Sequence, residues 1–305
     1  MTRKFAVFAW VVLAVQVLVI LWGAYVRASK SGAGCGGHWP LCNGEVLPAA
    51  PPLPMLIEFT HRVTSGIALL LVVALVVWAF RAFPRGNPVR RAAAWSGVFI
   101  VTESLIGAAL VLLGHTALNP STSRGITLTI HLINTMFLLG ALTLTAWWTG
   151  ARSIGEGKRA PRGVFYGAVA VFLAAGVAGA IAALGDTLFA PGSVAAALRA
   201  DFAANAHPFV RIRILHPILA VLAGLYLSAL AVHALGSPAS TPVARRLGSL
   251  LIGLVVIQFL AGGLNIYLLV PIPMQMVHLF LADALWISLV LLGAETLHPS
   301  ERARA

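Results

Sequence analysis

Four histidines occupy matched places in the apolar segments of this 305-residue chain. His61, His131, His216 and His278 each lie near the start of such a segment, and each segment is the second member of a predicted helical hairpin. A single histidine in a membrane helix can serve as an interhelical hydrogen-bond donor. Four at one depth, in two pairs, favour a metal site instead. Zinc usually takes cysteine, carboxylate or clustered histidine ligands, whereas two facing histidines suit the iron of a flat porphyrin.

Charged residues beside the first histidine are candidates for the same site. Glu58 precedes His61 by three residues, so the two share a helical face. Glu58 is either a site group or a helix-start residue favoured by the macrodipole. Arg62 can pair with a porphyrin propionate or a neighbouring acid, or extend to the membrane interface.

The chain has two cysteines, Cys35 and Cys42, and both lie in the first predicted outer loop. Gly36, Gly37 and Pro40 lie between them and favour a tight turn. Outside the cytoplasm a disulfide persists, and closing such a short loop would add about 2–3 kcal/mol of stability. The alternative is a thiol pair with a redox role.

The composition is that of a membrane protein. Hydrophobic residues make up 59% of the chain and charged residues 10%, and the mean hydropathy is +0.92. Runs of about 20 apolar residues are long enough to cross a bilayer. The net charge of +12 is not arranged as a basic stripe with interleaved aromatic residues, so we exclude nucleic-acid binding. We expect membrane spans near 5–27, 56–80, 92–113, 125–149, 163–184, 210–235, 246–269 and 273–294.

Basic residues alternate between the two sides of the predicted helices. One side holds 14 of the 21, and the positive-inside rule therefore predicts both termini in the cytoplasm. The outer loops would be 28–55, 114–124, 185–209 and 270–272, with all four histidines near the outer face. The 14 residues are Arg3, Lys4, Arg81, Arg85, Arg90, Arg91, Arg152, Lys158, Arg159, Arg162, Arg245, Arg246, Arg302 and Arg304.

The sequence also indicates an internal repeat. His61 matches His216, and His131 matches His278, while the run Glu103–Ala108 aligns with Gln258–Gly263. We therefore expect an all-α polytopic membrane protein of eight transmembrane helices, arranged as two pseudo-symmetric four-helix bundles, 1–150 and 151–305. An even number of spans per half makes the repeat parallel. Glycines that would admit a ring, or simply serve helix packing, are Gly66, Gly107, Gly140, Gly224, Gly262 and Gly263.

Haem A synthase is the family that this chain resembles. The resemblance is carried by the runs Gly23–Arg27 (GAYVR), Cys35–Gly44 (CGGHWPLCNG) and Glu58–Arg62 (EFTHR), together with eight spans and four histidines. It implies an oxidoreductase that converts the C8 methyl group of haem O to a formyl group, giving haem A for terminal oxidases. It also implies a multi-pass plasma-membrane location. Candidate partners are membrane lipid, the farnesyltransferase that makes haem O, and an electron donor.

The resemblance assigns roles to individual residues. His216 and His278 would ligate a b-type haem in the C-terminal half, while His61 and His131 would bracket the substrate haem. Glu58 corresponds to an acid that the family needs for turnover, in proton transfer or in stabilising a cationic intermediate. Cys35 and Cys42 match the first-loop pair of the family.

One departure and one alternative accompany this interpretation. Some bacterial relatives carry a second cysteine pair in the third outer loop, whereas 185–209 contains none, so other contacts must hold that loop.

The alternative function is a bis-haem b electron-transfer subunit linked to quinol, which would explain four histidines equally well. It does not explain Glu58 in register with His61. A solute transporter would have broken helices near the midplane, and the prolines lie near helix starts instead.

Overall fold

The computed structural model describes residues 2–150, 153–154, 162–238, 240–297 and 300–301. Eight helical segments in this part of the chain are long and apolar enough to cross a membrane. The multi-pass, all-helical architecture predicted from composition is thus confirmed. The helices are α1 (Thr2–Ala28), α2 (Leu53–Ala82), α3 (Pro88–Leu112), α4 (Thr122–Thr149), α5 (Arg162–Leu188), α6 (Val194–Asp201), α7 (Pro208–Ile212), α8 (Leu215–Gly236), α9 (Pro242–Tyr267) and α10 (Ile272–Leu297).

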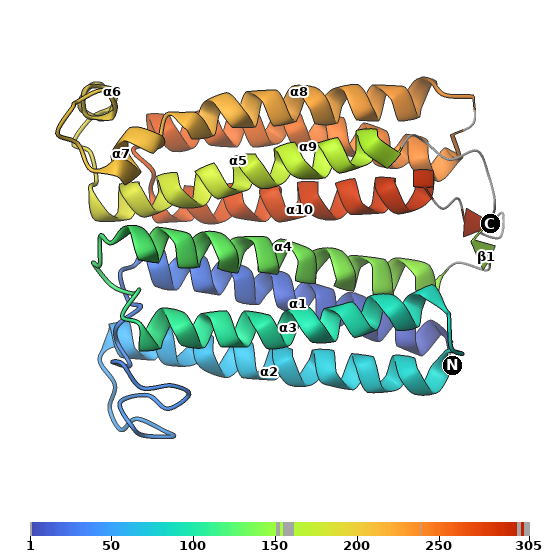
Figure 1. Ribbon diagram of the computed structural model, residues 1–305, viewed down its shortest axis with the longest axis horizontal. Coiled ribbons are helices and arrows are strands. Elements are labelled where there is room, and N and C mark those ends of the chain that lie inside the picture. Colours follow the sequence, from blue (N-terminus) through green and yellow to red (C-terminus); the bar gives the residue numbers. More distant parts are fainter. Residues whose placement is uncertain (1, 151–152, 155–161, 239, 298–299, 302–305) are drawn as a thin grey trace.

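The long helices run side by side in two groups (Figure 1). The N-terminal group is α1–α4, and the C-terminal group is α5, α8, α9 and α10. Both chain ends lie at one end of the molecule, here called the terminal end, and the α6–α7 segment lies at the opposite, loop end (Figure 1). Two short strands, β1 (Ser153–Ile154) and β2 (Ser300–Glu301), pair antiparallel at the terminal end. Pseudo-symmetry between the groups remains a prediction.

Several helices begin at residues that satisfy free backbone N–H groups. Asn87, Ser121 and Thr241 precede α3, α4 and α9, and each side chain accepts a hydrogen bond from an N–H two or three residues onward. Pro88 and Pro242 follow as the first helical residues, where the missing N–H is no loss. These signals fix where the helices start, and therefore the depth of the residues that follow.

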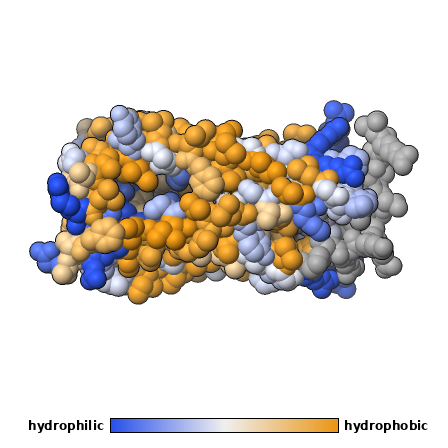
Figure 2. Space-filling view, turned by 90° about the horizontal axis from the view of Figure 1, so that it is seen from above, coloured by the Kyte–Doolittle hydropathy of each residue, from blue (hydrophilic) through white to orange (hydrophobic). Residues whose placement is uncertain are grey.

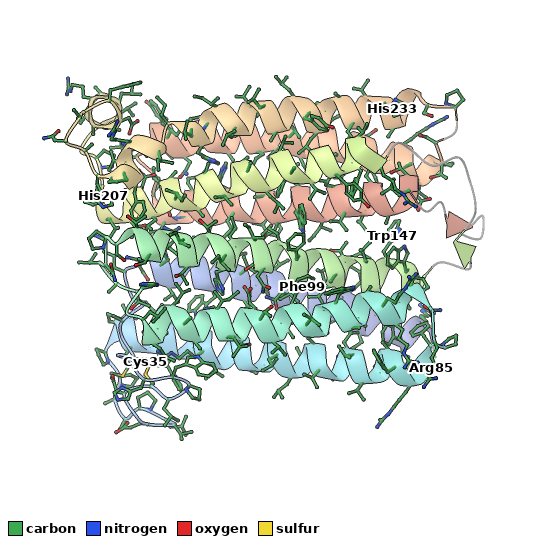
Figure 3. All side chains as sticks on the ribbon, in the orientation of Figure 1. Cys35, Arg85, Phe99, Trp147, His207 and His233 are labelled. Atoms are coloured by element: carbon green, nitrogen blue, oxygen red, sulfur yellow. A yellow bond between two sulfur atoms is a disulfide. The ribbon has the colours of Figure 1, made fainter. Side chains whose placement is uncertain are left out.

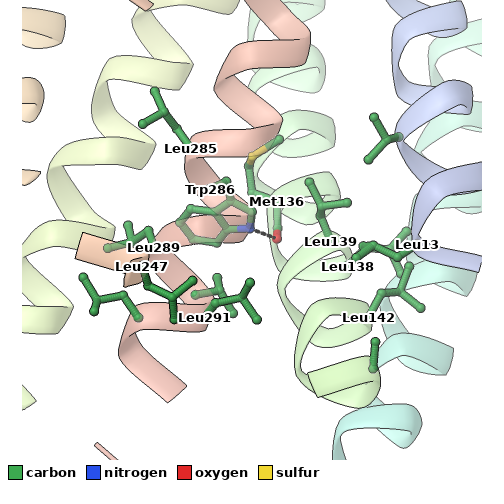
Figure 4. Packing of buried hydrophobic residues seen from close by; sticks show 14 of the residues in the cluster. Leu13, Met136, Leu138, Leu139, Leu142, Leu247, Leu285, Trp286, Leu289 and Leu291 are labelled. Carbon is green, nitrogen blue, oxygen red and sulfur yellow. Dashed lines mark hydrogen bonds between the residues drawn. The ribbon is translucent and has the colours of Figure 1, made fainter. Parts of the chain in front are cut away.

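Two contacts join the groups at different levels. Near the middle, Trp286 of α10 donates its indole N–H to the carbonyl of Met136 on α4 at 2.7 Å, among packed leucines (Figure 4). At the loop end, Arg27 of α1 donates to the carbonyl of Ala183 and the hydroxyl of Thr187 on α5, and to the amide oxygen of Gln275 on α10. The groups thus form one packed unit.

The surface matches a membrane environment. Figure 2 shows hydrophobic residues covering the middle of the molecule and hydrophilic residues concentrated towards its two ends. The same face is hollowed on the side away from the grey atoms, where hydrophilic atoms are visible between hydrophobic rims (Figure 2).

The predicted spans agree with the observed helices to within a few residues at most ends. The sequence analysis missed α6, which folds part of the third loop into a short helix, and it placed the start of a long span, 210–235, where α7 lies. It also missed the break between α7 and α8 at Arg213 and Ile214. Pro217 explains that break, because it has no N–H for the carbonyl of Arg213 and its ring disfavours a continuous helix there. Some residues used to predict orientation lie outside the described part of the chain: Arg152, Lys158, Arg159, Arg302 and Arg304.

The third loop, which lacks cysteines, is held by an arginine. Arg213 forms ion pairs with Asp186 at the end of α5 and with Asp201 at the end of α6, both at 2.6 Å. It also donates to the carbonyl of Ala197 within α6. One guanidinium therefore ties the loop helix to both neighbouring segments.

We expect Arg213→Met to loosen this loop, because it leaves two nearly buried carboxylates without their partner. The loss of stability should be roughly 3 kcal/mol, as for a broken ion pair of low exposure. Thermal unfolding of the detergent-solubilised protein and protease cleavage within 189–212 would measure it. Arg211→Met, an exposed change on α7 two residues before Arg213, is the matched control and should behave like the parent. Equal resistance of both variants would contradict the prediction.

Candidate functional site

All four predicted histidines lie at the loop end of the molecule. His61, His131 and His278 follow the first residues of α2, α4 and α10 by 8, 9 and 6 residues, and His216 follows Pro208 of α7 by 8. At 1.5 Å per residue, these depths are roughly 9–14 Å along the helices. Figure 3 marks the ends: Cys35 and His207 lie at the loop end, and Arg85 and His233 at the terminal end.

His216 and His278 face each other inside the C-terminal group. Their ring centroids are 6.2 Å apart and the ring planes are nearly perpendicular, at 89°. Metal–imidazole bonds are about 2 Å long, so two rings that share one metal ion have centroids roughly 6 Å apart. The observed separation therefore fits two axial ligands of one iron.

Nitrogen atoms of all four imidazoles are placed so that a bound group could be their partner. Nδ1 of His216 lies 3.0 Å from the carbonyl oxygen of Ala175, a contact that would leave Nε2 free to bind a metal. Nδ1 of His61, His131 and His278 is buried without a hydrogen-bond partner in the described part of the chain. His61 and His131 are close enough to interact electrostatically. Buried polar atoms without partners are costly, so they point to a bound group.

Glycines make room for three of the rings. A Cβ at Gly23 of α1 would lie 2.9 Å from Cε1 of His61, and one at Gly179 of α5 would lie 2.8 Å from Cε1 of His216. A Cβ at Gly262 of α9 would lie 3.1 Å from Cε1 of His278. Any larger residue would displace the imidazole.

The sequence analysis identified one of these three glycines. Gly262 was among the six candidates, whereas Gly23 and Gly179 were missed. Each is the glycine of a Gly-Ala pair in the first helix of its half, and that correspondence was the available signal. Gly140 and Gly224 serve packing against Trp286 and Phe259. A Cβ at the remaining candidates, Gly66, Gly107 and Gly263, would meet nothing within 4 Å.

Glu58 and Arg62 connect the first loop to α2. The Arg62 guanidinium donates to Oε1 of Glu58 at 2.6 Å and to the carbonyls of His38 and Leu41. Oε2 of Glu58 accepts the backbone N–H of Cys35 at 2.9 Å. Both carboxylate oxygens thus have loop or helix partners, one turn before His61. Arg62 pairs with a neighbouring acid, one of the alternatives raised by the sequence.

Cys35 and Cys42 form a disulfide, and both are buried. The cross-link closes the loop directly above the Glu58 contact. A disulfide was one of the two alternatives for this pair, and the structure has it in that state.

A carboxylate and an amide accompany the histidines on the fourth helix of each half. Oε1 of Glu103 on α3 lies 3.7 Å from Nε2 of His131. The amide nitrogen of Gln258 on α9 lies 3.3 Å from Nε2 of His278.

Asp283 lies five residues after His278 on α10. It is fully buried, and its two oxygens have no hydrogen-bond partner in the described residues.

An apolar groove of about 480 Å³ lies between the two groups and is lined by residues of α4, α5, α7 and α8. Ile133 of α4 and Leu215 and Leu219 of α8 line it near His131 and His216. Within the described ranges, there is no cluster of three or more histidine, cysteine or acidic side chains that could hold a bare metal ion. Paired imidazoles suit a metal whose other ligands come from a macrocycle.

Comparison with known proteins gives the family of the chain. A family model described as "Cytochrome oxidase assembly protein" (COX15-CtaA) matches residues 6–290. A protein named Heme A synthase from Exiguobacterium sp. is 39% identical over 112 residues, 37% of each chain. One of the same name from Symbiobacterium thermophilum is 44% identical over 99 residues, 32% of each chain.

A longer relative matches nearly the whole chain. A protein from Thermus thermophilus named Protoheme IX farnesyltransferase is 49% identical over 298 residues, which are 96% of this chain and 48% of that protein. The chain thus spans about half the length of this relative. The family model, in contrast, includes all four histidines, both cysteines and Glu58 within its matched range. The predicted resemblance is confirmed, and the chain belongs to the COX15-CtaA family of cytochrome oxidase assembly proteins.

Proposed function

We propose that this protein is a haem A synthase that oxidises the C8 methyl group of haem O to a formyl group. The separation of His216 and His278, which would let both rings hold one metal ion, carries the proposal. Membership of the family and the relatives named Heme A synthase support it. In this proposal, 1–150 is the substrate half and 151–305 holds a resident b-type haem.

The two histidine pairs would have different tasks. His216 and His278 would hold the b-type haem, which would relay single electrons between the substrate site and an external redox partner. His61 and His131 would bracket haem O, so that its C8 methyl group is held in a fixed orientation. The positive-inside rule supports both termini in the cytoplasm and the histidines near the outer face of the plasma membrane.

Glu58 is the proposed catalytic residue. It lies one helical turn before His61. Its contacts with Arg62 and with the backbone of Cys35 hold its carboxylate beneath the first loop of this half. A proton leaving the substrate could move to this carboxylate, which its contact with Arg62 holds in place. Arg62 would remain available to a propionate through rearrangement of its loop contacts.

The relative from Thermus thermophilus supports a partner for the reaction. Its name is that of a farnesyltransferase, and this chain matches only about half of it. We therefore propose that the enzyme supplying haem O acts beside this protein, so that an apolar product passes between them within the membrane. An electron donor would be the second partner.

Pigment analysis tests the proposed function. The protein is co-expressed with a source of haem O, and extracted haems are separated by chromatography. A new formyl-bearing haem A is the expected result, because neither haem O nor haem B carries that group. Stable b-type haem reduced by quinol, without a formyl product, would instead support the bis-haem electron-transfer subunit and overturn the synthase.

We expect Glu58→Ala to retain the b-type haem spectrum and to lose haem A production. Glu58→Gln is the matched control for loop structure, because its amide oxygen still accepts the Cys35 N–H. If the carboxylate acts in chemistry, both variants lose activity while the Gln variant keeps a protease-resistant first loop. Full haem A production in Glu58→Ala would remove Glu58 from the mechanism.

We expect His278→Ala to lose the b-type haem, because one axial ligand of the proposed pair is gone. The absorption spectrum of the purified, reduced protein measures this loss. His233→Ala is the control, since His233 is exposed and lies at the terminal end of α8. An unchanged haem spectrum in His278→Ala would show that the ligands are paired differently.

A further inference from the structure

The side chain of Arg27 reaches from the N-terminal group into the C-terminal group. Its Nη1 donates to the carbonyl of Ala183 at 2.8 Å and to the hydroxyl of Thr187 at 2.7 Å, both on α5. Its Nη2 donates to the amide oxygen of Gln275 on α10 at 3.1 Å. A guanidinium that belongs to α1 therefore lies between two helices of the other group.

These partners place the guanidinium one helical turn outward from the C-terminal histidine pair. On α5, which runs towards the loop end, Ala183 comes four residues after Gly179, and Gly179 lies against the ring of His216. On α10, which starts at the loop end, Gln275 comes three residues before His278. Residues three or four apart lie on one face of a helix. The guanidinium is therefore on the outer side of both imidazoles.

The positive charge of Arg27 has no acid of its own. Its hydrogen bonds within the described residues all go to neutral oxygen atoms. Asp186, the acid that attracts it, is already paired with Arg213 at 2.6 Å. Arg124 of α4 is close enough to add a second positive charge, and its Nε is buried without an acceptor in the described part of the chain. Cations that lie away from water without a carboxylate partner favour an anionic ligand.

The guanidinium also has donors left for such a ligand. Of the five N–H groups of an arginine, the three hydrogen bonds leave the Nε–H and one N–H of Nη2. Nε and Nη2 form one edge of the guanidinium, and two parallel N–H groups can bind both oxygens of a carboxylate. Arg27 can thus hold a carboxylate without releasing α5 or α10.

A b-type haem carries two propionate groups on one edge, and both are carboxylates. We propose that Arg27 binds a propionate of the haem held by His216 and His278. The N-terminal half then contributes a residue to the haem site of the C-terminal half. This inference rests on the proposed function, in which 151–305 holds the resident haem.

A cation beside a propionate also affects the reduction potential of the iron. Reduction adds one negative charge to the haem, and a nearby positive charge stabilises the more negative form. The surroundings of a haem set its potential through such interactions. Arg27 should therefore raise the potential of the C-terminal haem and make it a better electron acceptor.

The test compares haem with its dimethyl ester, in which both propionates are neutral. Both N-terminal histidines, His61 and His131, are replaced by alanine in the full-length protein, so that the C-terminal site is measured alone. Each porphyrin is titrated into this haem-free parent in detergent, and its affinity is read from the absorption spectrum. Arg27→Gln is compared with Lys30→Gln, which removes an exposed charge three residues further along the chain.

We expect the parent to bind haem about tenfold more tightly than the ester, as is typical of a hydrogen bond to a charged group. Arg27→Gln should lose this preference, because it binds haem more weakly and the ester equally well. Redox titration of its haem complex should give a lower midpoint potential. Lys30→Gln should match the parent in both measurements. A residue with only a structural role would weaken the binding of both porphyrins alike, so the preference separates the two roles.

An unchanged preference for haem in Arg27→Gln overturns the inference, and so does a parent that shows no preference. If Arg27→Gln binds neither porphyrin and has therefore misfolded, Arg27→Lys is decisive, because it keeps the charge but cannot bind both oxygens of a carboxylate. Its preference should fall while its potential stays close to that of the parent, and an unchanged preference there also overturns the inference. Failure of the proposed function has a different result, namely an unaltered protein that forms no haem A from haem O although its C-terminal site prefers haem to the ester.

Discussion

The structure depends on one constraint: a polar side chain between membrane helices needs a partner. Most buried polar groups near the loop end satisfy it within the chain, as Glu58 does with Arg62 and Cys35. Three of the four imidazoles do not, because each has a buried Nδ1 without a partner in the described residues. An orphaned buried polar atom costs about 1–3 kcal/mol. Such atoms in matching places of the two halves are what the proposed haem sites would explain.

The surroundings of the rings follow from the same constraint. An imidazole that must meet a flat ligand cannot be enclosed by large side chains, and Gly23 and Gly179 provide space on the neighbouring helices. The first and third loops are anchored to the helices by side chains of opposite charge. At three residues before the histidine, the N-terminal half has the acid Glu58 and the C-terminal half has the base Arg213. Each anchors its loop, so the same position performs the same structural task with opposite charge.

Much of this arrangement could be predicted from the sequence. Apolar runs located the spans, because a bilayer fixes the length of an apolar helix, and the spacing of His61, His131, His216 and His278 indicated one level and two pairs. The sequence did not reveal α6 or the break after α7, where Arg213 makes tertiary contacts with Asp186 and Asp201. Nor could it distinguish glycines that contact an imidazole from those that pack helices, because that depends on the rotation of each helix about its axis.

The links between the two groups restrict how a large molecule can reach the histidines. Arg27 fastens α1 to α5 and α10 at the loop end, and Trp286 fastens α10 to α4 near the middle. Because the two helix groups are linked at two levels, they cannot rotate apart about one link without breaking the other. Lateral approach along the apolar groove lined by residues of α4, α5, α7 and α8 would leave both links intact. A hydrophobic tail would make a molecule well suited to such a route.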